Sequence, residues 1–329
     1  MGARIAELSQ ETRVGLRAAD EGRQDEFARL DLGLADRSFA LVKGGLARGW
    51  YSLWLKGAPQ YQRYRTAALG HFYADSPETA LALLAHGREQ ALAAGMGYLL
   101  GPLDGSTWRG YRLTTDDYGC PPFFLDRLTP LFWAECFVGA GFSRIAEYFS
   151  TKSAHLAYEE PAAPVWLERI RAGQCVLRPL NMDAFEDDLR EMYELSRISF
   201  ASNFLYTPIG LPEFLAMYRP LGKYIRPEFV QLAHMEGRLA GFCLCLPDYA
   251  QQERGRAIES LILKTVARDP APDCKGLGAF LFWNSHRLAA EHGFHALITA
   301  FMHSENASLH LARKAGKPIR SYALYGREL

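Results

Sequence analysis

The sequence has no surplus of charge of either sign. Lys and Arg together number 37, and Asp and Glu together also number 37, in a chain of 329 residues. A protein dedicated to nucleic acid draws much of its affinity from excess basic side chains, so this balance argues against nucleic acid as the main partner. The chain also lacks the run of about 20 apolar residues that a membrane-crossing helix needs. We expect neither a nucleic-acid nor a membrane partner.

Cysteine is scarce and dispersed. The six cysteines form no Cys-x-x-Cys pair and no Cys/His cluster with metal-ligand spacing, which predicts no metal site. Cys243 and Cys245 are two residues apart in an apolar stretch, so a strand would turn both to the same side as buried thiols. Residues 1–9 have no apolar core of the kind found in secretory signals, and we expect a cytoplasmic protein.

The length and the apolar content favour two folded domains. A domain usually takes about 100 to 200 residues, and the 49% hydrophobic content suffices for a core in each half. The cluster Pro161-Ala162-Ala163-Pro164 predicts a linker, because proline opposes both helix interiors and central strands. We therefore divide the chain into residues 1–160 and 165–329.

The first half reads as an alternation of strands and helices. Asp75 and Ser76 are suitable N-caps and Pro77 fits a first turn, which predicts a helix over 78–94 that Gly95 closes. The first thirty-odd residues are weakly periodic and indicate one short helix ending in apolar residues between 27 and 34. The other expected elements are strands at 49–55, 65–72, 97–102 and 142–151 and a helix at 131–139.

The second half has a longer and clearer order of elements. Glu236-Gly237 is a turn signal between two strands and predicts a hairpin. The expected order is strand 175–179, helix 183–200, helix 211–218, hairpin strands 229–233 and 239–244, strand 259–267, helix 276–292, strand 296–302, helix 308–315 and strand 319–327.

The segment Lys275-Gly276-Leu277-Gly278 joins a strand to a helix. The first turn of a helix offers unpaired amide hydrogens and a partial positive charge, and glycine lets a phosphate come close to the backbone. With the order of elements around it, this loop resembles the Gln/Arg-x-x-Gly-x-Gly/Ala loop of the GNAT acyltransferases. Over residues 40–329 the chain is most similar to tandem GNAT proteins.

The resemblance implies an α/β (α+β) fold class with two tandem GNAT-like domains. Each would be a mixed, mostly antiparallel, twisted sheet flanked by helices. The co-substrate would be acetyl-CoA or another acyl-CoA, held in the second half, because no glycine loop opens the first-half helix after Ser76. The implied coenzyme-binding residues are Val266, Ala267, Lys275, Gly276, Leu277, Gly278, Ala279 and Asn306.

The sequence departs from the family pattern at two places. Asp273 stands where the loop has Gln or Arg and puts a negative charge near the expected pyrophosphate. Ala312 and Arg313 stand where the family often has a Tyr that protonates the leaving thiolate. The proton donor is therefore left open, with Tyr325 on the closing strand as one candidate.

Acyl transfer to an amine requires a group that takes a proton from it. His303 and Glu305, after the strand 296–302, are candidates for this base, and Glu259 is another. A solvated loop histidine, a helix-capping glutamate and a strand-end charge are equally ordinary explanations of these residues. Packing is the more common role for a strand tyrosine such as Tyr325.

Four further residues are candidates for binding the acceptor. Lys264 lies in the middle of an apolar strand, where a charge needs a partner, either an acidic acceptor or a nearby carboxylate. Trp108, Arg109 and Arg112 form an aromatic and basic cluster in a loop after a buried strand, suited to a carboxylate or phosphate. They would serve equally well to fill a seam between domains and to cap carbonyl groups.

Together these features favour an N-acyltransferase, most simply an N-acetyltransferase, acting on the amine of a small molecule or amino-acid-like acceptor. We expect a monomer or homodimer. Two alternatives remain open. One is a non-catalytic GNAT-fold protein that binds a ligand or assembles with others, which Asp273 and the missing Tyr favour. The other is an aminoacyl-tRNA-dependent transferase, which the neutral charge and the glycine loop disfavour.

Overall fold

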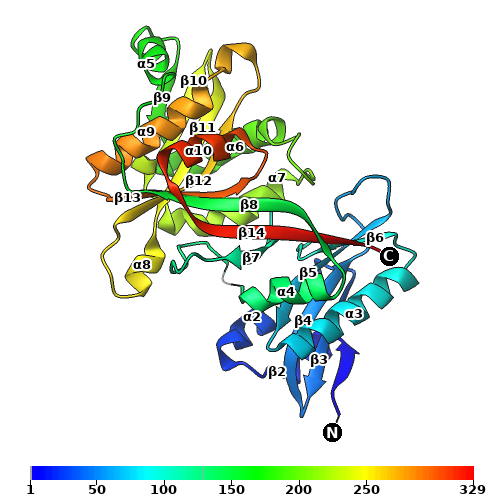
Figure 1. Cartoon of the computed structure of the whole chain (residues 1–329). Coiled ribbons are helices and arrows are strands. Elements are labelled where there is room, and N and C mark those ends of the chain that lie inside the picture. The colour runs from blue at the N-terminus through cyan, green and yellow to red at the C-terminus, as the bar shows by residue number, and fades with distance from the viewer. Residues whose placement is uncertain (1, 128) are drawn as a thin grey trace.

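In the computed structural model, which describes residues 2–127 and 129–329, the strands join into one 14-stranded sheet (Figure 1). Its order is β1-β3-β4-β5-β6-β14-β8-β13-β12-β11-β10-β9, with β2 beside β4 and β7 beside β14. The strands are β1 (Arg4–Glu7), β2 (Arg17–Ala18), β3 (Arg37–Lys43), β4 (Leu46–Trp54), β5 (Thr66–Ala74), β6 (Tyr98–Gly101), β7 (Leu113–Asp116), β8 (Ser143–Ser153), β9 (Val176–Pro179), β10 (Val230–Met235), β11 (Arg238–Pro247), β12 (Ser260–Arg268), β13 (Ala296–His303) and β14 (Lys317–Glu328).

Helices cover the sheet in both halves. In the second half α9 packs on β11, β12 and β13, and α6 packs on the other face of β11 and β12. The helices are α1 (Gln10–Val14), α2 (Gln24–Ala28), α3 (Pro77–Ala93), α4 (Leu131–Gly139), α5 (Ala163–Arg171), α6 (Phe185–Ser199), α7 (Leu211–Tyr218), α8 (Tyr249–Glu253), α9 (Leu277–Glu291) and α10 (Ala307–Ala315). Short 3-10 turns lie at η1 (Glu21–Arg23), η2 (Met182–Ala184), η3 (Arg219–Tyr224), η4 (Pro227–Phe229) and η5 (Pro272–Cys274).

The two halves repeat one arrangement. In the first half antiparallel β3, β4 and β5 lead through α3 to β6, which pairs parallel to β5. In the second half antiparallel β10, β11 and β12 lead through α9 to β13, which pairs parallel to β12. A parallel pair needs a crossover, and in both halves one helix supplies it. The α/β class and the mixed, mostly antiparallel sheet predicted from the sequence are confirmed.

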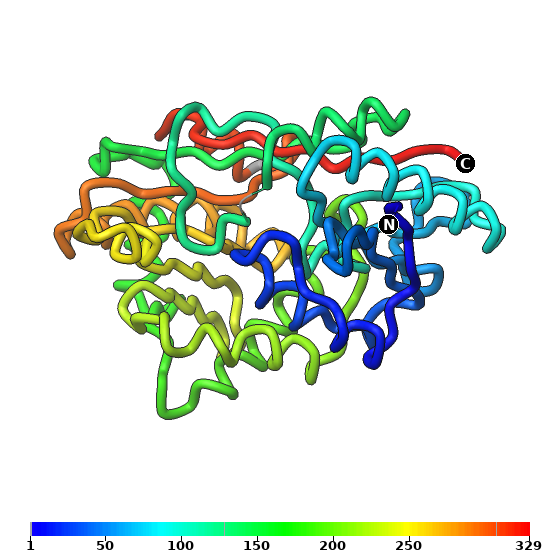
Figure 2. Tube along the Cα trace, turned by 90° about the horizontal axis from the view of Figure 1, so that it is seen from below, coloured from blue at the N-terminus to red at the C-terminus, as the bar shows by residue number. Residues whose placement is uncertain are grey.

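The closing strands of the two halves are exchanged. β8, from the first half, pairs with β13 of the second half, and the C-terminal β14 pairs with β6 of the first half. β8 and β14 also pair with each other from Lys317↔Lys152 to Gly326↔Ser143. They are the long green and red strands that run side by side between the halves in Figure 1 and along one side of both halves in Figure 2.

The helix α3 shows why local signals locate elements well. The Ser76 hydroxyl accepts a hydrogen bond from the Thr79 amide, and Pro77 lies in the first turn, as the sequence predicts. Leu83 and Leu84 are buried on the sheet side in the core of the first half. No helix in the described part of the chain is both long and apolar enough to cross a membrane.

The segment 161–164, predicted as a linker, instead begins the helix α5. Pro164 falls in its first turn, where proline is tolerated because that amide has no partner inside the helix. Trp166 is almost fully buried and packs against Phe280 of α9. The division at residues 160 and 165 itself stays a prediction.

The N-terminal segment was also predicted incompletely. One short helix was expected in the first thirty-odd residues, and the structure has two there, α1 and α2, with Phe27 of α2 buried in the first core. The strands β1 and β3 were missed. β1 has four residues, and its pairing with β3 joins residues more than 30 positions apart. β3 does have a local signal, the apolar run Phe39-Ala40-Leu41-Val42 before Gly44-Gly45, which was overlooked.

Candidate active site

The central strands of the second half separate and leave a wedge. The parallel pairing of β12 with β13 ends at Leu263↔Thr299. Beyond it, Phe301 has a left-handed φ of 62° at a register shift of β13 against β8. On β12 a register shift leaves Lys264 without a partner on β11. The facing edges of β12 and β13 past this point are open to an extended ligand.

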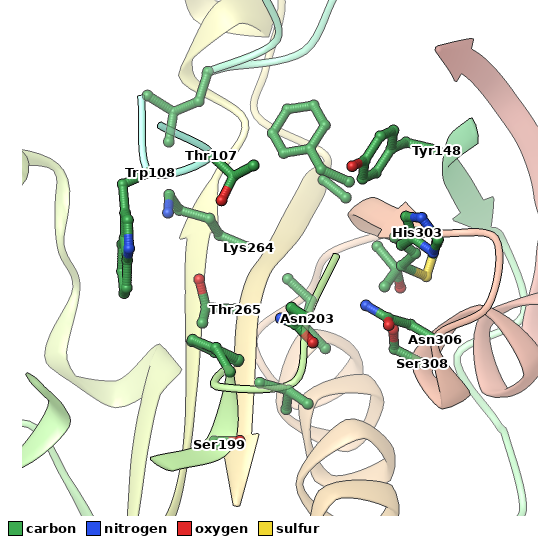
Figure 3. Close-up of a pocket in the computed structure, with 18 of the residues that line it drawn as sticks. Thr107, Trp108, Tyr148, Ser199, Asn203, Lys264, Thr265, His303, Asn306 and Ser308 are labelled. Carbon is green, nitrogen blue, oxygen red and sulfur yellow. The ribbon is translucent and has the colours of Figure 1, made fainter. Parts of the chain in front are cut away.

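A cavity of about 1070 Å³ includes this wedge and reaches the first half (Figure 3). Its size is that of a site for a large ligand. The lining residues discussed below come from loop 103–112, the segment 125–127, the connection after α6, the end of α7, strands β8, β12, β13 and β14, and the starts of α9 and α10. They are Trp108, Arg109, Tyr111, Arg112, Asp126, Arg127, Tyr148, Phe204, Tyr218, Lys264, Val266, Arg268, Gly276, Gly278, Ala279, Phe301, His303, Asn306 and Tyr322.

The first turn of α9 faces the cavity without a cap. Gly276 is its N-cap with a left-handed φ of 86°, and no side chain hydrogen-bonds the free amides. Gly276 and Gly278 both line the cavity. The uncapped amides and the positive end of the helix dipole make this turn a suitable place for an anion.

Asp273 does not carry its charge into the cavity. Its carboxylate lies 3.9 Å from the Arg238 guanidinium, and its backbone carbonyl accepts a hydrogen bond of 2.6 Å from Arg169. Arg268, the last residue of β12, does line the cavity, and its Cδ would lie 3.8 Å from a Cβ placed on Gly278. Arg268 was missed, although its place at the end of the strand before the glycine loop could have identified it.

The corresponding wedge in the first half is filled by the chain itself. Beyond the paired part of β5 and β6, the Leu103 amide donates to the Leu69 carbonyl (2.8 Å) and the His71 amide to the Asp104 carboxylate (2.5 Å). At the start of α3, the Thr79 amide already donates to the Ser76 hydroxyl, and the Thr79 hydroxyl donates to the Asp75 carboxylate. Among the described residues, the two halves therefore differ at the wedge and at the helix start beside it, which are open in the second half and filled in the first.

Loop 103–112 connects the first half to the second. The Trp108 indole donates a hydrogen bond of 2.9 Å to the Thr207 carbonyl. Arg109 forms an ion pair of 2.5 Å with Glu213 of α7. Both side chains also line the cavity. Each can therefore contact the second half and still lie where the sequence predicts acceptor binding.

Lys264 reaches the same region from β12. Its ammonium lies 5.3 Å from the centre of the Tyr218 ring, which gives a cation–π contact. Within residues 2–127 and 129–329 no carboxylate lies within 4.0 Å of it. Figure 3 places Lys264 and Trp108 on one side of the cavity, opposite His303 and Asn306.

His303 lies on the other wall of the cavity, beside Tyr148 and Phe204. Its Nδ1 accepts a hydrogen bond of 3.1 Å from the Glu305 amide, so the neutral ring carries its hydrogen on Nε2. Burial lowers the pKa of His303, and the charge of Glu305 opposes this only partly. The ring is thus a neutral hydrogen-bond donor in the arrangement observed.

Three predicted catalytic side chains do not line the cavity. Glu259 precedes β12, at the end away from the wedge, and lies 3.8 Å from His295. Glu305 is exposed beyond β13. Tyr325 is fully buried in the first core against Phe137.

Some predicted coenzyme contacts are placed near the cavity without lining it. Ala267 and Leu277 have buried side chains, and Lys275 is exposed. That these three residues contact the coenzyme stays a prediction, and such contacts would come from their backbone. Val266, Gly276, Gly278, Ala279 and Asn306 do line the cavity.

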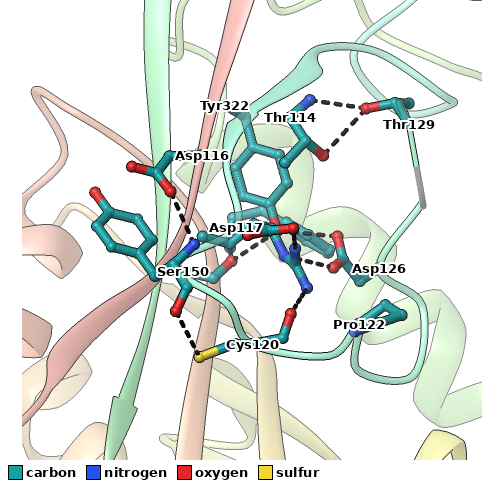
Figure 4. Close-up of polar contacts among 12 residues, drawn as sticks. Thr114, Asp116, Asp117, Cys120, Pro122, Asp126, Thr129, Ser150 and Tyr322 are labelled. Atoms are coloured by element: carbon teal, nitrogen blue, oxygen red, sulfur yellow. Dashed lines mark hydrogen bonds and ion pairs between the residues drawn. The ribbon is translucent and has the colours of Figure 1, made fainter. Parts of the chain in front are cut away.

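A buried ionic cluster on the cavity wall was missed by the sequence reading (Figure 4). Arg320 Nε lies 2.9 Å from Asp126 Oδ2, and the Tyr322 hydroxyl donates a hydrogen bond of 3.0 Å to Asp126 Oδ1. Burial raises the pKa of Asp126, which the charge of Arg320 and the Tyr322 hydrogen bond offset only in part. Residue 126 lies almost 200 positions from its partners, and no local pattern marks such a cluster.

The comparisons with known proteins place this geometry in a known fold. A GCN5-related N-acetyltransferase from Sphaerobacter thermophilus matches with a TM-score of 0.53 and 13% identity over 99% of this chain and 95% of that chain. A tandem GNAT protein from the clavulanic acid biosynthesis pathway matches with a TM-score of 0.53 and 14% identity over 99% and 98%. A GNAT acetyltransferase from Colwellia psychrerythraea has a TM-score of 0.51 and 11% identity over 99% and 100%.

No protein-family model matches the sequence, and no curated protein matches it. The structural likeness extends over nearly the whole chain at low identity and shows the fold. The chain has the fold of the GNAT acetyltransferases, in an arrangement similar to that of a tandem GNAT protein.

Proposed function

We propose that the chain is an acyl-CoA-dependent N-acyltransferase with one coenzyme site, in the second half. The observation that carries this proposal is the contrast between the two wedges. The wedge of β12 and β13 is open beside an uncapped helix start, and the wedge of β5 and β6 is filled by Leu103 and Asp104. The GNAT fold supports the same reaction class.

The residues of the open wedge fit an acyl-CoA. The amides at Gly276 to Ala279 and the Arg268 guanidinium would hold the pyrophosphate, and the open edge of β12 at Val266 and Ala267 would hold the pantetheine arm. The thioester supplies an activated acyl group. Its carbonyl needs a hydrogen-bond donor when an amine attacks, because negative charge develops on the oxygen.

His303 and Asp126 offer complementary proton chemistry on the cavity wall. His303, with its hydrogen on Nε2, is suited to donate a hydrogen bond to the acyl oxygen or the leaving sulfur. Asp126, reached through the Tyr322 hydroxyl, has a raised pKa and is suited to accept the proton that the amine loses. The proposal thus departs from the sequence prediction, which had His303 as a candidate base, and assigns His303 the role of hydrogen-bond donor.

Binding of acetyl-CoA to the purified chain tests the proposal directly. A ligand that binds only the folded state stabilises it by about 2.7 kcal/mol at 100 times its Kd, so the melting temperature should rise with acetyl-CoA concentration. Release of free thiol on adding a panel of primary amines should then report transfer. No shift with any acyl-CoA would favour the non-catalytic reading, and salt-sensitive RNA binding would favour the tRNA-dependent one.

The pH dependence should report on His303. Because burial lowers its pKa, the ring stays neutral at pH 7, and kcat/KM should fall only as the pH drops through a midpoint below 6.5. Protonation would place a hydrogen on Nδ1, against the Glu305 amide hydrogen. His303→Asn keeps a neutral hydrogen-bond donor, so it should retain activity and lose the part of this fall at low pH that His303 contributes, while the part due to protonation of Asp126 remains. His303→Ala should be at least about 10-fold slower. An unchanged fall at low pH in His303→Asn would assign it to another group.

A further inference from the structure

The Arg112 guanidinium lies within a cage of aromatic rings. Its centre is 4.0 Å from the ring centre of Phe301, 4.3 Å from Tyr111, 5.2 Å from Tyr322 and 5.6 Å from Tyr148. Aromatic faces attract the cation and fix its orientation. They accept no in-plane hydrogen bonds, so the N–H groups at the guanidinium edge still need a partner.

The other cavity arginines considered above already have partners. Arg109 pairs with Glu213, Arg127 pairs with Asp104 at 3.0 Å, and Arg268 donates to the Asp269 carbonyl at 2.7 Å. In the described residues, the Arg112 guanidinium makes no hydrogen bond and has no carboxylate within 4.0 Å. The guanidinium nitrogens are not buried, and Arg112 lines the cavity, so these nitrogens are accessible from it.

Asp126, whose carboxyl group also feels the Arg112 charge, does not form an ion pair with Arg112 within 4.0 Å. The two oxygens of Asp126 are engaged by the Tyr322 hydroxyl and by Arg320, and Asp117 lies 4.0 Å from Arg320. Arg112 therefore keeps an unused set of donors of the planar, forked kind that suits a carboxylate.

The backbone at Arg112 adds an independent observation. Its φ of 68° is left-handed, a conformation that is unfavourable for a non-glycine residue and persists where surrounding structure enforces it. The Arg112 amide donates to the Pro102 carbonyl at 3.2 Å, which ties the residue to the end of β6. The strained backbone thus directs the side chain into the cavity.

The position of Arg112 distinguishes an acceptor from coenzyme phosphate. Its cage residue Phe301 packs with Phe123 against Ile262 and Ile298, on one face of β12 and β13. The first turn of α9 lies on the opposite face, where Leu263 and Leu297 pack in the α9 core. We propose that Arg112 binds the carboxylate of the acceptor, so that the enzyme acylates amines that carry a carboxylate, such as amino acids. This inference rests on the proposed function.

An acid and amide panel tests this substrate class. The twenty L-amino acids and their C-terminal amides would be offered with acetyl-CoA, and products measured by mass spectrometry. At least one acid should be acetylated about 100-fold more efficiently than its amide, because only the acid has the charge that Arg112 binds. Arg112→Met should lose that preference and keep coenzyme affinity within about twofold. The control Arg197→Met, which removes an arginine over Tyr193 outside the cavity lining, should keep the preference.

Equal rates with an acid and its amide would overturn the proposal. A tenfold loss of coenzyme affinity in Arg112→Met would also overturn it, by assigning the arginine to a phosphate. If no amino acid is acetylated, titration with benzoate decides. The NMR signal of the Arg112 Nε–H is the arginine Nε–H signal that disappears in Arg112→Met. In the wild type this signal should shift saturably with benzoate, and its failure to shift would refute carboxylate binding. This titration needs no coenzyme, so it separates failure of this inference from failure of the proposed function.

Discussion

Gly278→Glu should abolish coenzyme binding and leave the chain folded. A Cβ at Gly278 would have only the Arg268 Cδ within 4 Å, at 3.8 Å, so a side chain fits there. An acidic residue in the first turn of α9 is favourable for the helix itself. The same carboxylate would oppose the pyrophosphate and pair with Arg268. Affinity for acetyl-CoA, measured by calorimetry, should fall at least about 100-fold, equivalent to about 2.8 kcal/mol.

Two controls separate charge from bulk. Gly278→Gln adds nearly the same volume without charge and should weaken binding much less. Gly276→Glu is a poorer test, because Gly276 has a left-handed φ and its Cβ would lie 3.3 Å from Ala162 and Trp166. Full coenzyme affinity in a folded Gly278→Glu variant would disprove the assignment of the site to this helix.

The elements that the sequence located are those with local signals. The helix α3 follows from Ser76 and Pro77, and the turn at Glu236-Gly237 lies where the hairpin was predicted, with both residues at positive φ. The glycine loop before α9 was found because strand, glycine turn and helix are adjacent in the chain. It lies at the cavity as expected, with Gly276 and Gly278 among the lining residues.

The features that the sequence did not reveal depend on contacts between distant residues or on which face of a strand a side chain occupies. Tyr325 was chosen on the closing strand, yet Tyr322, three residues earlier, is the one that lines the cavity, because strand positions an odd number apart face opposite sides. The partners of Asp126 lie on β14, and the chain segment that fills the first-half wedge is recognised only once β5 and β6 are placed. Composition and periodicity contain no information on such pairings.

The exchange of β8 and β14 was also invisible in the sequence, and it determines how a separated second half should behave. A fragment of residues 165–329 would retain β13 and β14 but lose β8, which pairs with both. Two unpaired strand edges and the apolar side chains beside them would be exposed, and such edges promote aggregation. We expect this fragment to be poorly soluble, with coenzyme binding surviving only in whatever fraction folds.

A longer fragment, residues 142–329, should behave better because it supplies β8 in continuity with α5. It restores the pairing of β8 with β13 and β14 and leaves open only the edge of β14 that faces β6 and β7. Size-exclusion chromatography and thermal shift with acetyl-CoA would rank the two fragments. A soluble, monomeric 165–329 fragment with a sharp unfolding transition would show that β8 is dispensable, and the exchanged strands would then not be what joins the two halves.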